Sequence, residues 1–113
     1  MERQAREIVG FVDSHQGVSG IQIKVTDRNE FDRAGKIVRQ TPAVECQFTH
    51  FVNYGTGIAP QERIEIISRD CNPGFWSRPS WSCGSEYLKA RIVVAEVHAY
   101  YTARGKEIKA TFE

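Results

Sequence analysis

Long apolar runs are missing from this sequence. No hydrophobic stretch approaches the roughly 18 consecutive apolar residues that a membrane-spanning helix needs. The residues that follow Met1 are charged and amphipathic, so the apolar core of a secretory signal peptide is missing as well. We therefore expect no membrane span in this chain. Two interpretations stay open: a cytoplasmic protein, and a soluble fragment in which an initiator Met replaces a removed signal or anchor.

A strong charge imbalance is also absent. The formal net charge is +1, and basic and acidic residues are interleaved, as in Arg28, Glu30, Asp32 and Arg33. A domain that binds duplex nucleic acid normally carries a basic face, so we predict no such partner. Hydrophobic residues at 41% and charged residues at 26% exclude a mainly disordered chain. With no internal repeat or linker, the 113 residues should form one α+β domain over residues 1–113.

The motifs of common catalytic sites are missing too. The sequence has no Gly-x-Ser-x-Gly elbow, no HExxH pair and no Walker-type glycine loop. Cys46 and His50 have the spacing of half a zinc finger. On a strand, however, that spacing separates the side chains by about 13 Å, which is too far to share one ion. We therefore expect no metal site and no cofactor, with Cys46 as a small buried residue.

What the sequence does contain is one conspicuous segment, residues 71–83. It holds both tryptophans, two of the four prolines and two of the three cysteines. Because proline interrupts helices and central strands, we predict a surface loop here. In an oxidising compartment, a Cys71–Cys83 disulfide would close this loop and stabilise the fold by about 3 kcal/mol. Large side chains in the loop are predicted to bind a partner: Phe75, Trp76, Arg78 and Trp81.

The same residues allow a second interpretation, in which Trp76 or Trp81 folds back to cap the sheet. The predicted disulfide favours an extracytoplasmic location, periplasmic or secreted, while a cytoplasmic location with free thiols stays open. The expected partner is another protein, with a glycan as the alternative. The sequence leaves the oligomeric state undetermined.

Hydrophobic periodicity predicts the elements around this loop. Apolar residues at helical spacing from Ala5 to Val12 predict a helix over residues 2–15. A nearly continuous apolar run at residues 92–97 predicts a central strand that is buried on both faces. The predicted strands cover residues 21–26, 36–40, 43–53, 62–68, 87–102 and 108–112, with a loop at 27–35 and turns at 53–57 and 103–106.

These elements predict an α+β fold with one N-terminal helix packed on a five- or six-stranded mostly antiparallel sheet. Residues 87–102 and 108–112 are expected to form an antiparallel hairpin. In outline, a helix followed by such a sheet and a late cysteine-bounded loop is similar to soluble regions of type IV pilin-like subunits and to cystatin-like domains. Residues 16–20 (QGVSG) loosely resemble the QxVxG loop of cystatins. Both are similarities of shape.

The predicted function is a non-enzymatic binding or assembly module, of the pilus or secretion type or of the inhibitor or immunity type. The alternative is a small acid–base hydrolase. A helix against a sheet with His, Glu and Arg on its open face resembles the layout of small microbial ribonucleases, where these groups move protons and stabilise the phosphorane. The residues expected on such a face are His50, His98, Glu65, Glu96, Arg63 and Arg69.

Overall fold

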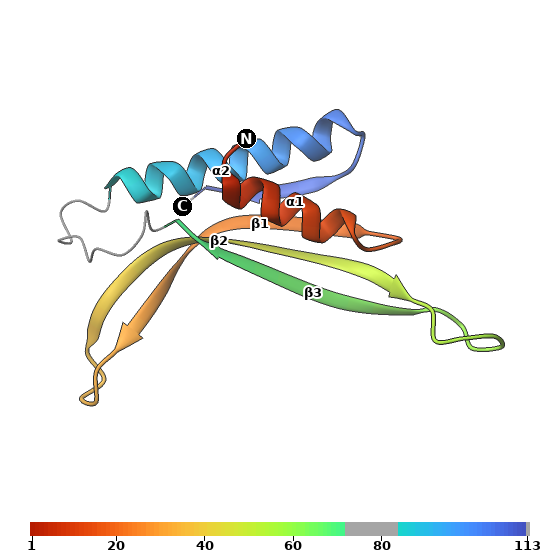
Figure 1. Ribbon diagram of the computed structural model, residues 1–113, viewed down its shortest axis with the longest axis horizontal. Coiled ribbons are helices and arrows are strands. Elements are labelled where there is room, and N and C mark those ends of the chain that lie inside the picture. Colours follow the sequence, from red (N-terminus) through yellow and green to blue (C-terminus); the bar gives the residue numbers. More distant parts are fainter. Residues whose placement is uncertain (72–83, 113) are drawn as a thin grey trace.

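The computed structural model describes residues 1–71 and 84–112. Both of its helices lie on one side of a strongly curved sheet (Figure 1). This arrangement confirms the predicted α+β class, with the N-terminal helix packed on a mostly antiparallel sheet. The elements are α1 (Arg3–Asp13), β1 (Ser19–Phe31), β2 (Ile37–Val52), β3 (Gln61–Asp70), α2 (Gly84–Ala103) and β4 (Ile108–Thr111).

Within the described residues the sheet has four strands, in the order β3-β2-β1-β4. The pairs β1–β2 and β2–β3 are antiparallel, as expected for strands joined by hairpins. β4 instead pairs parallel with β1, where Ile21 lies opposite Ile108. The predicted hairpin between residues 87–102 and 108–112 is therefore wrong.

The largest correction concerns residues 87–102, which belong to helix α2 and not to a strand. Its buried residues follow helical spacing, and they are Ala90, Val93, Val94, Val97 and Tyr101. The outward-facing Leu88 and Ile92 are also apolar, so the run looks hydrophobic on every face. A β-branched run of this kind favours a strand by propensity alone, and packing against the sheet overrides that preference.

β1 and β2 are each longer than the sequence predicted. The predicted loop at residues 27–35 is mostly strand, and the hairpin turns only at Asp32–Lys36. Asp32 stabilises this turn because its Oδ1 accepts bonds from the backbone N–H groups of Ala34 and Lys36, both at 2.9 Å. Residues 27–31 are exposed, with the exposed Phe31 at their end, and so lack the alternation that marks a half-buried strand.

Pro42 lies inside β2, so the strands predicted at residues 36–40 and 43–53 form one continuous strand. The carbonyl of Pro42 accepts a bond from the Cys71 N–H at 2.9 Å, directly after β3 ends. In a strand the N–H and C=O of one residue point to the same neighbour. The missing N–H of Pro42 therefore faces the end of β3, and the ladder between β1 and β2 continues past it.

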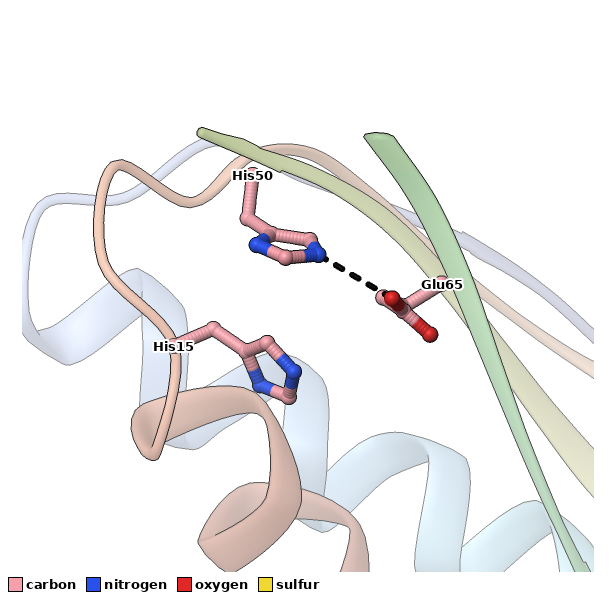
Figure 2. A group of neighbouring side chains, drawn as sticks. All are labelled: His15, His50 and Glu65. Atoms are coloured by element: carbon pink, nitrogen blue, oxygen red, sulfur yellow. Dashed lines mark hydrogen bonds and ion pairs between the residues drawn. The ribbon is translucent and has the colours of Figure 1, made fainter. Parts of the chain in front are cut away.

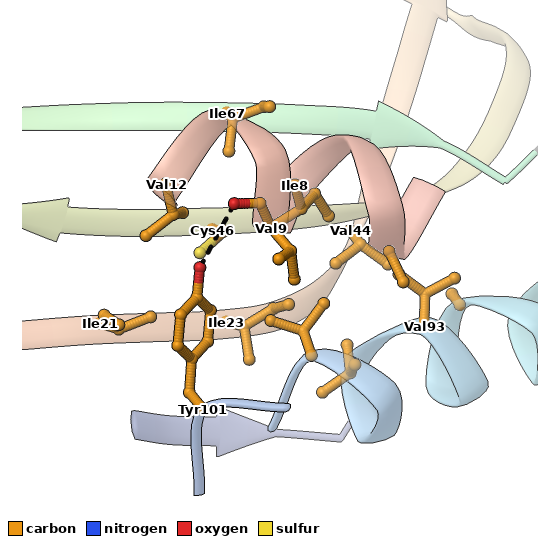
Figure 3. Close-up of a cluster of buried hydrophobic side chains, with 14 of the residues drawn as sticks. Ile8, Val9, Val12, Ile21, Ile23, Val44, Cys46, Ile67, Val93 and Tyr101 are labelled. Carbon is orange, nitrogen blue, oxygen red and sulfur yellow. Dashed lines mark hydrogen bonds between the residues drawn. The ribbon is translucent and has the colours of Figure 1, made fainter. Parts of the chain in front are cut away.

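The hydrophobic core fills the space between the two helices and the covered sheet face (Figure 3). α1 contributes Ala5, Ile8, Val9 and Val12, which confirms the predicted helical stripe. β1 and β2 contribute their alternate residues, including Ile23, Val44, Cys46 and Phe48. Periodicity correctly placed α1 and β3 (Gln61–Asp70), and the glycine-rich signal at residues 53–57 correctly placed the turn before β3.

Candidate functional site

A histidine and a carboxylate meet on the covered face of the sheet, near the C-terminal end of α1. His50 lies on β2 opposite Arg63 of β3, and Glu65 is two residues further along β3 on the same face. His50 Nε2 and Glu65 Oε1 are 3.1 Å apart. The His50 side chain is buried and the Glu65 side chain is one-third exposed. This pair therefore lies at the boundary between the core and solvent.

His15, in the loop that follows α1, completes the group. Its Nδ1 lies 2.7 Å from the Phe11 carbonyl oxygen, and its ring centroid lies 4.5 Å from that of His50. Figure 2 shows the His15 ring facing the His50–Glu65 pair. One nitrogen or oxygen from each of the three residues lies within 4.8 Å of the others. We call His15, His50 and Glu65 the two-histidine cluster.

The hydrogen bonds assign protons in this cluster. A backbone carbonyl only accepts, so the proton between His15 and Phe11 belongs to His15 Nδ1. In neutral imidazole this leaves His15 Nε2 with a free lone pair. The Glu65 carboxylate likewise accepts from His50 Nε2. Edge-to-face packing of His15 against Phe11 and Phe48 restricts the orientation of its ring.

The six residues proposed for acid–base chemistry do not share a sheet face. Glu96 and His98 lie on α2, where a two-residue step rotates side chains by about 200° around the axis. Glu96 Oε2 accepts a bond from the Glu2 N–H at 2.9 Å, and Glu2 is the N-cap residue of α1. Arg69 binds Glu7 at 2.7 Å. Of the six, the structure joins only His50 and Glu65 by a hydrogen bond in the described region.

Sequence reasoning missed His15, because it read the residue only as part of a helix end. The position of His15 is set by the backbone pairing of the residue that follows it, Gln16. The Phe51 N–H donates to the Gln16 carbonyl at 3.3 Å, which continues the β1–β2 alignment and brings the end of α1 beside His50. That alignment follows from the hairpin register, in which Ser19 is opposite Thr49.

The opposite face of the sheet is not covered by any element in the described residues. Its β2–β3 half carries Phe51, Ile64 and Ile66, whose exposed fractions are 48%, 65% and 55%. Ile64 is opposite Thr49, and Ile66 is opposite Gln47. We call Phe51, Ile64 and Ile66 the apolar strip. Polar side chains occupy the β1–β4 half of this face, including Lys24 and Lys109.

The loop residues predicted to bind a partner lie outside the described residues. This holds for Phe75, Trp76, Arg78 and Trp81, and also for Cys83. Cys71 is buried directly after β3. The Cys71–Cys83 disulfide and the binding role of the loop therefore stay predictions.

Cys46 is buried in the core, as the sequence predicted. Burial raises the pKa of its thiol from 9.0 to about 12, so it is a protonated core residue at neutral pH. It and His50 lie on the same strand, β2, so their side chains are separated as expected.

No protein-family model, curated protein or solved structure matches this chain. Neither helix among the described residues is both long and apolar enough to cross a lipid bilayer.

Proposed function

We propose that this chain is a non-enzymatic binding or assembly module that recognises an extended segment of another protein along β3. The apolar strip is the observation that carries this proposal. Its three large side chains are each about half exposed or more on an otherwise polar face. Exposed apolar side chains that are grouped in this way are typical of interaction sites.

The position of the strip at a sheet edge supports a strand-like partner. β3 pairs with β2 on one side, and no described strand pairs with its other side. An added strand would bond to the free backbone groups of β3, while Ile64 and Ile66 would contact its alternate side chains. The carbonyls of Ser68 and Asp70 already accept bonds from Arg69 and Gln4, so the edge that is open to such pairing covers residues 61–67.

The charges of β3 favour a different protein over a second copy of this chain. A second copy paired antiparallel with Ile64 opposite Ile66 would place the two Glu65 side chains opposite each other. Like charges in opposed positions destabilise a sheet. Charged residues along an edge also discourage unspecific pairing, and β3 carries Glu62, Arg63, Glu65 and Arg69.

The predicted aromatic loop follows β3 directly in the chain, since β3 ends at Asp70. We propose that its side chains extend the same binding surface. Trp76→Ala and Trp81→Ala should then weaken binding of the same partner while leaving the circular dichroism spectrum unchanged.

A peptide selection tests the proposed function. Random peptides displayed on phage are selected on the wild-type protein, and the enriched peptides are measured by fluorescence anisotropy. Ile66→Lys should weaken their binding about tenfold or more, because burying one isoleucine side chain contributes about 1.5–3 kcal/mol. Leu88→Lys is the matched control, since Leu88 is 59% exposed but lies on α2.

Two results would count against the proposal. One is failure to enrich any peptide. The other is equal loss of binding in the Ile66 and Leu88 variants, which would indicate unspecific hydrophobic contact. Turnover of RNA that is lost in Glu65→Gln would instead favour the hydrolase alternative.

A further inference from the structure

We propose that the two-histidine cluster is a binding site for a divalent transition-metal ion, with zinc as the best-fitting ion. The site joins three elements: the loop after α1 supplies His15, β2 supplies His50 and β3 supplies Glu65. It lies on the covered face of the sheet, opposite to the face that carries the apolar strip.

The donor set suits zinc. Two imidazole nitrogens and one carboxylate oxygen are ligand types that zinc commonly takes, and three protein ligands leave a fourth position for water. Ligand bonds of about 2.0–2.1 Å in a tetrahedral site place the ligand atoms about 3.3 Å from each other. His50 Nε2 and Glu65 Oε1, at 3.1 Å, already have close to this spacing. Zinc would replace the proton that His50 Nε2 shares with Glu65, and the neutral His50 ring would then carry its proton on Nδ1.

His15 needs a small movement to join them. The largest separation between ligand atoms in the cluster is within 4.8 Å, so closing it to about 3.3 Å requires a shift of about 1.5 Å. His15 is only partly buried and lies in a loop, which allows this shift. Glu65 is one-third exposed, and an ion can therefore enter from solvent beside it.

The surroundings of the cluster resemble those of a metal site. A metal-binding imidazole usually donates its second N–H to a carbonyl or carboxylate, which fixes the ring and its tautomer. His15 Nδ1 makes such a bond to the Phe11 carbonyl at 2.7 Å, which leaves Nε2 for the ion. Ring contacts of His50 with His15 and Phe48 restrict the second imidazole.

A bound ion would link the loop after α1 to β2 and to the edge strand β3. It would also hold the loop that carries Gln16 and Gly17, and this loop contacts Phe51 of the apolar strip. The Gln16 carbonyl accepts the Phe51 N–H at 3.3 Å. A Cβ added to Gly17 would approach a Phe51 ring carbon at 2.7 Å, so the loop and ring lie in close contact.

Zinc titration of the metal-free, fully reduced protein tests the site. Isothermal calorimetry should give one zinc ion per chain, and zinc should raise the thermal unfolding temperature. His15→Gln and Glu65→Gln should each weaken zinc binding at least tenfold. His98→Gln is the matched control, because His98 lies on α2 outside the cluster, and it should bind zinc like the wild type.

Nuclear magnetic resonance of the wild-type imidazole nitrogens gives a second measurement that needs no variant. Zinc should shift the ring signals of His15 and His50 and leave those of His98 in place. The proposal is overturned if zinc produces no saturable binding, or if His15→Gln and Glu65→Gln bind zinc as tightly as the wild type. It is also overturned if the His98 signals move while those of His15 and His50 do not.

Discussion

Cys46 and Tyr101 bring two weakly acidic groups into the core beneath α1. The Tyr101 hydroxyl donates to Asp13 Oδ1 at 2.9 Å, and its side chain is fully buried beside Cys46 (Figure 3). Burial raises the pKa of Tyr101, and the bond to Asp13 raises it further. Burial raises the pKa of Cys46 to about 12. Both groups are therefore protonated in the folded protein well into the alkaline range.

Because the pKa values of Cys46 and Tyr101 are raised in the folded protein, we predict that stability falls at alkaline pH. The unfolded chain releases the Cys46 proton above pH 9.0, whereas the folded protein keeps it until about pH 12. The unfolded state then binds fewer protons, so the free energy of unfolding falls as pH rises through this range, by up to about 1.4 kcal/mol per pH unit for each group. Tyr101 adds to the fall above pH 10.0.

Urea unfolding of the reduced protein at pH 8, 9.5 and 10.5 measures this effect. Cys46→Ala lowers stability at every pH, but its stability should decline less steeply between the first two values. A wild-type profile and a Cys46→Ala profile with the same slope would show that the thiol does not titrate in the way proposed.

At the scale of elements, α2 holds α1 at both of its ends. At the C-terminal end of α1, the hydroxyls of Tyr100 and Tyr101 donate to the two carboxylate oxygens of Asp13 at 2.6 and 2.9 Å. At the N-terminal end, Glu96 Oε2 accepts the Glu2 N–H. α1 has no side-chain cap of its own and no acidic residue in its first turn, so Glu96 supplies the negative charge that a helix start favours.

Glu96→Gln should therefore lower the free energy of unfolding by about 0.3–1 kcal/mol, since the amide keeps an acceptor but removes the charge. The difference from wild type should shrink at 1 M salt, where charges are screened. Glu107→Gln makes the same charge change in an exposed residue after α2 and serves as the control. Equal effects of the two substitutions in chemical denaturation would argue against a capping role for Glu96.

At the scale of the whole molecule, the sheet extends well beyond the two helices. Figure 1 shows the β1–β2 hairpin and the β2–β3 hairpin projecting away from the helical layer. The outer part of the β1–β2 hairpin carries exposed apolar side chains, with Phe31, Ile37 and Val38 exposed by 61%, 54% and 63%. These residues bury little surface and so contribute little to the hydrophobic core.

Replacing residues 29–40 by Asn-Gly should therefore leave the core folded. Arg28 and Thr41 are a cross-strand pair, and a two-residue turn can join them. The melting temperature should change by no more than about 4 °C, which corresponds to about 1 kcal/mol. Ile23→Ala, in the covered part of the same strand pair, should cost about 2–5 kcal/mol by comparison. Loss of cooperative thermal unfolding in the shortened chain would show that the projecting hairpin belongs to the core.

The secondary structure of segments with one buried and one polar face could be assigned from the sequence. This applies to α1 and to the buried stretch of β1 at Ile21, Ile23 and Val25. Each has a periodicity of 3.6 or 2 because burial selects only one face. The α+β class followed from these elements, and so did Cys46 as a buried residue.

Only the tertiary structure decided α2, the parallel pairing of β4 and the two-histidine cluster. Local periodicity cannot distinguish a helix from a strand when an apolar run is nearly continuous, as between Ile92 and Val97; packing on the sheet selects the helix. Likewise, His15, His50 and Glu65 are distant in sequence, and their encounter depends on strand register and on where α1 lies on the sheet. The sequence by itself determined which segments bury one face, because that pattern is local. Only the tertiary structure decided which distant residues meet, because packing of the elements brings them together.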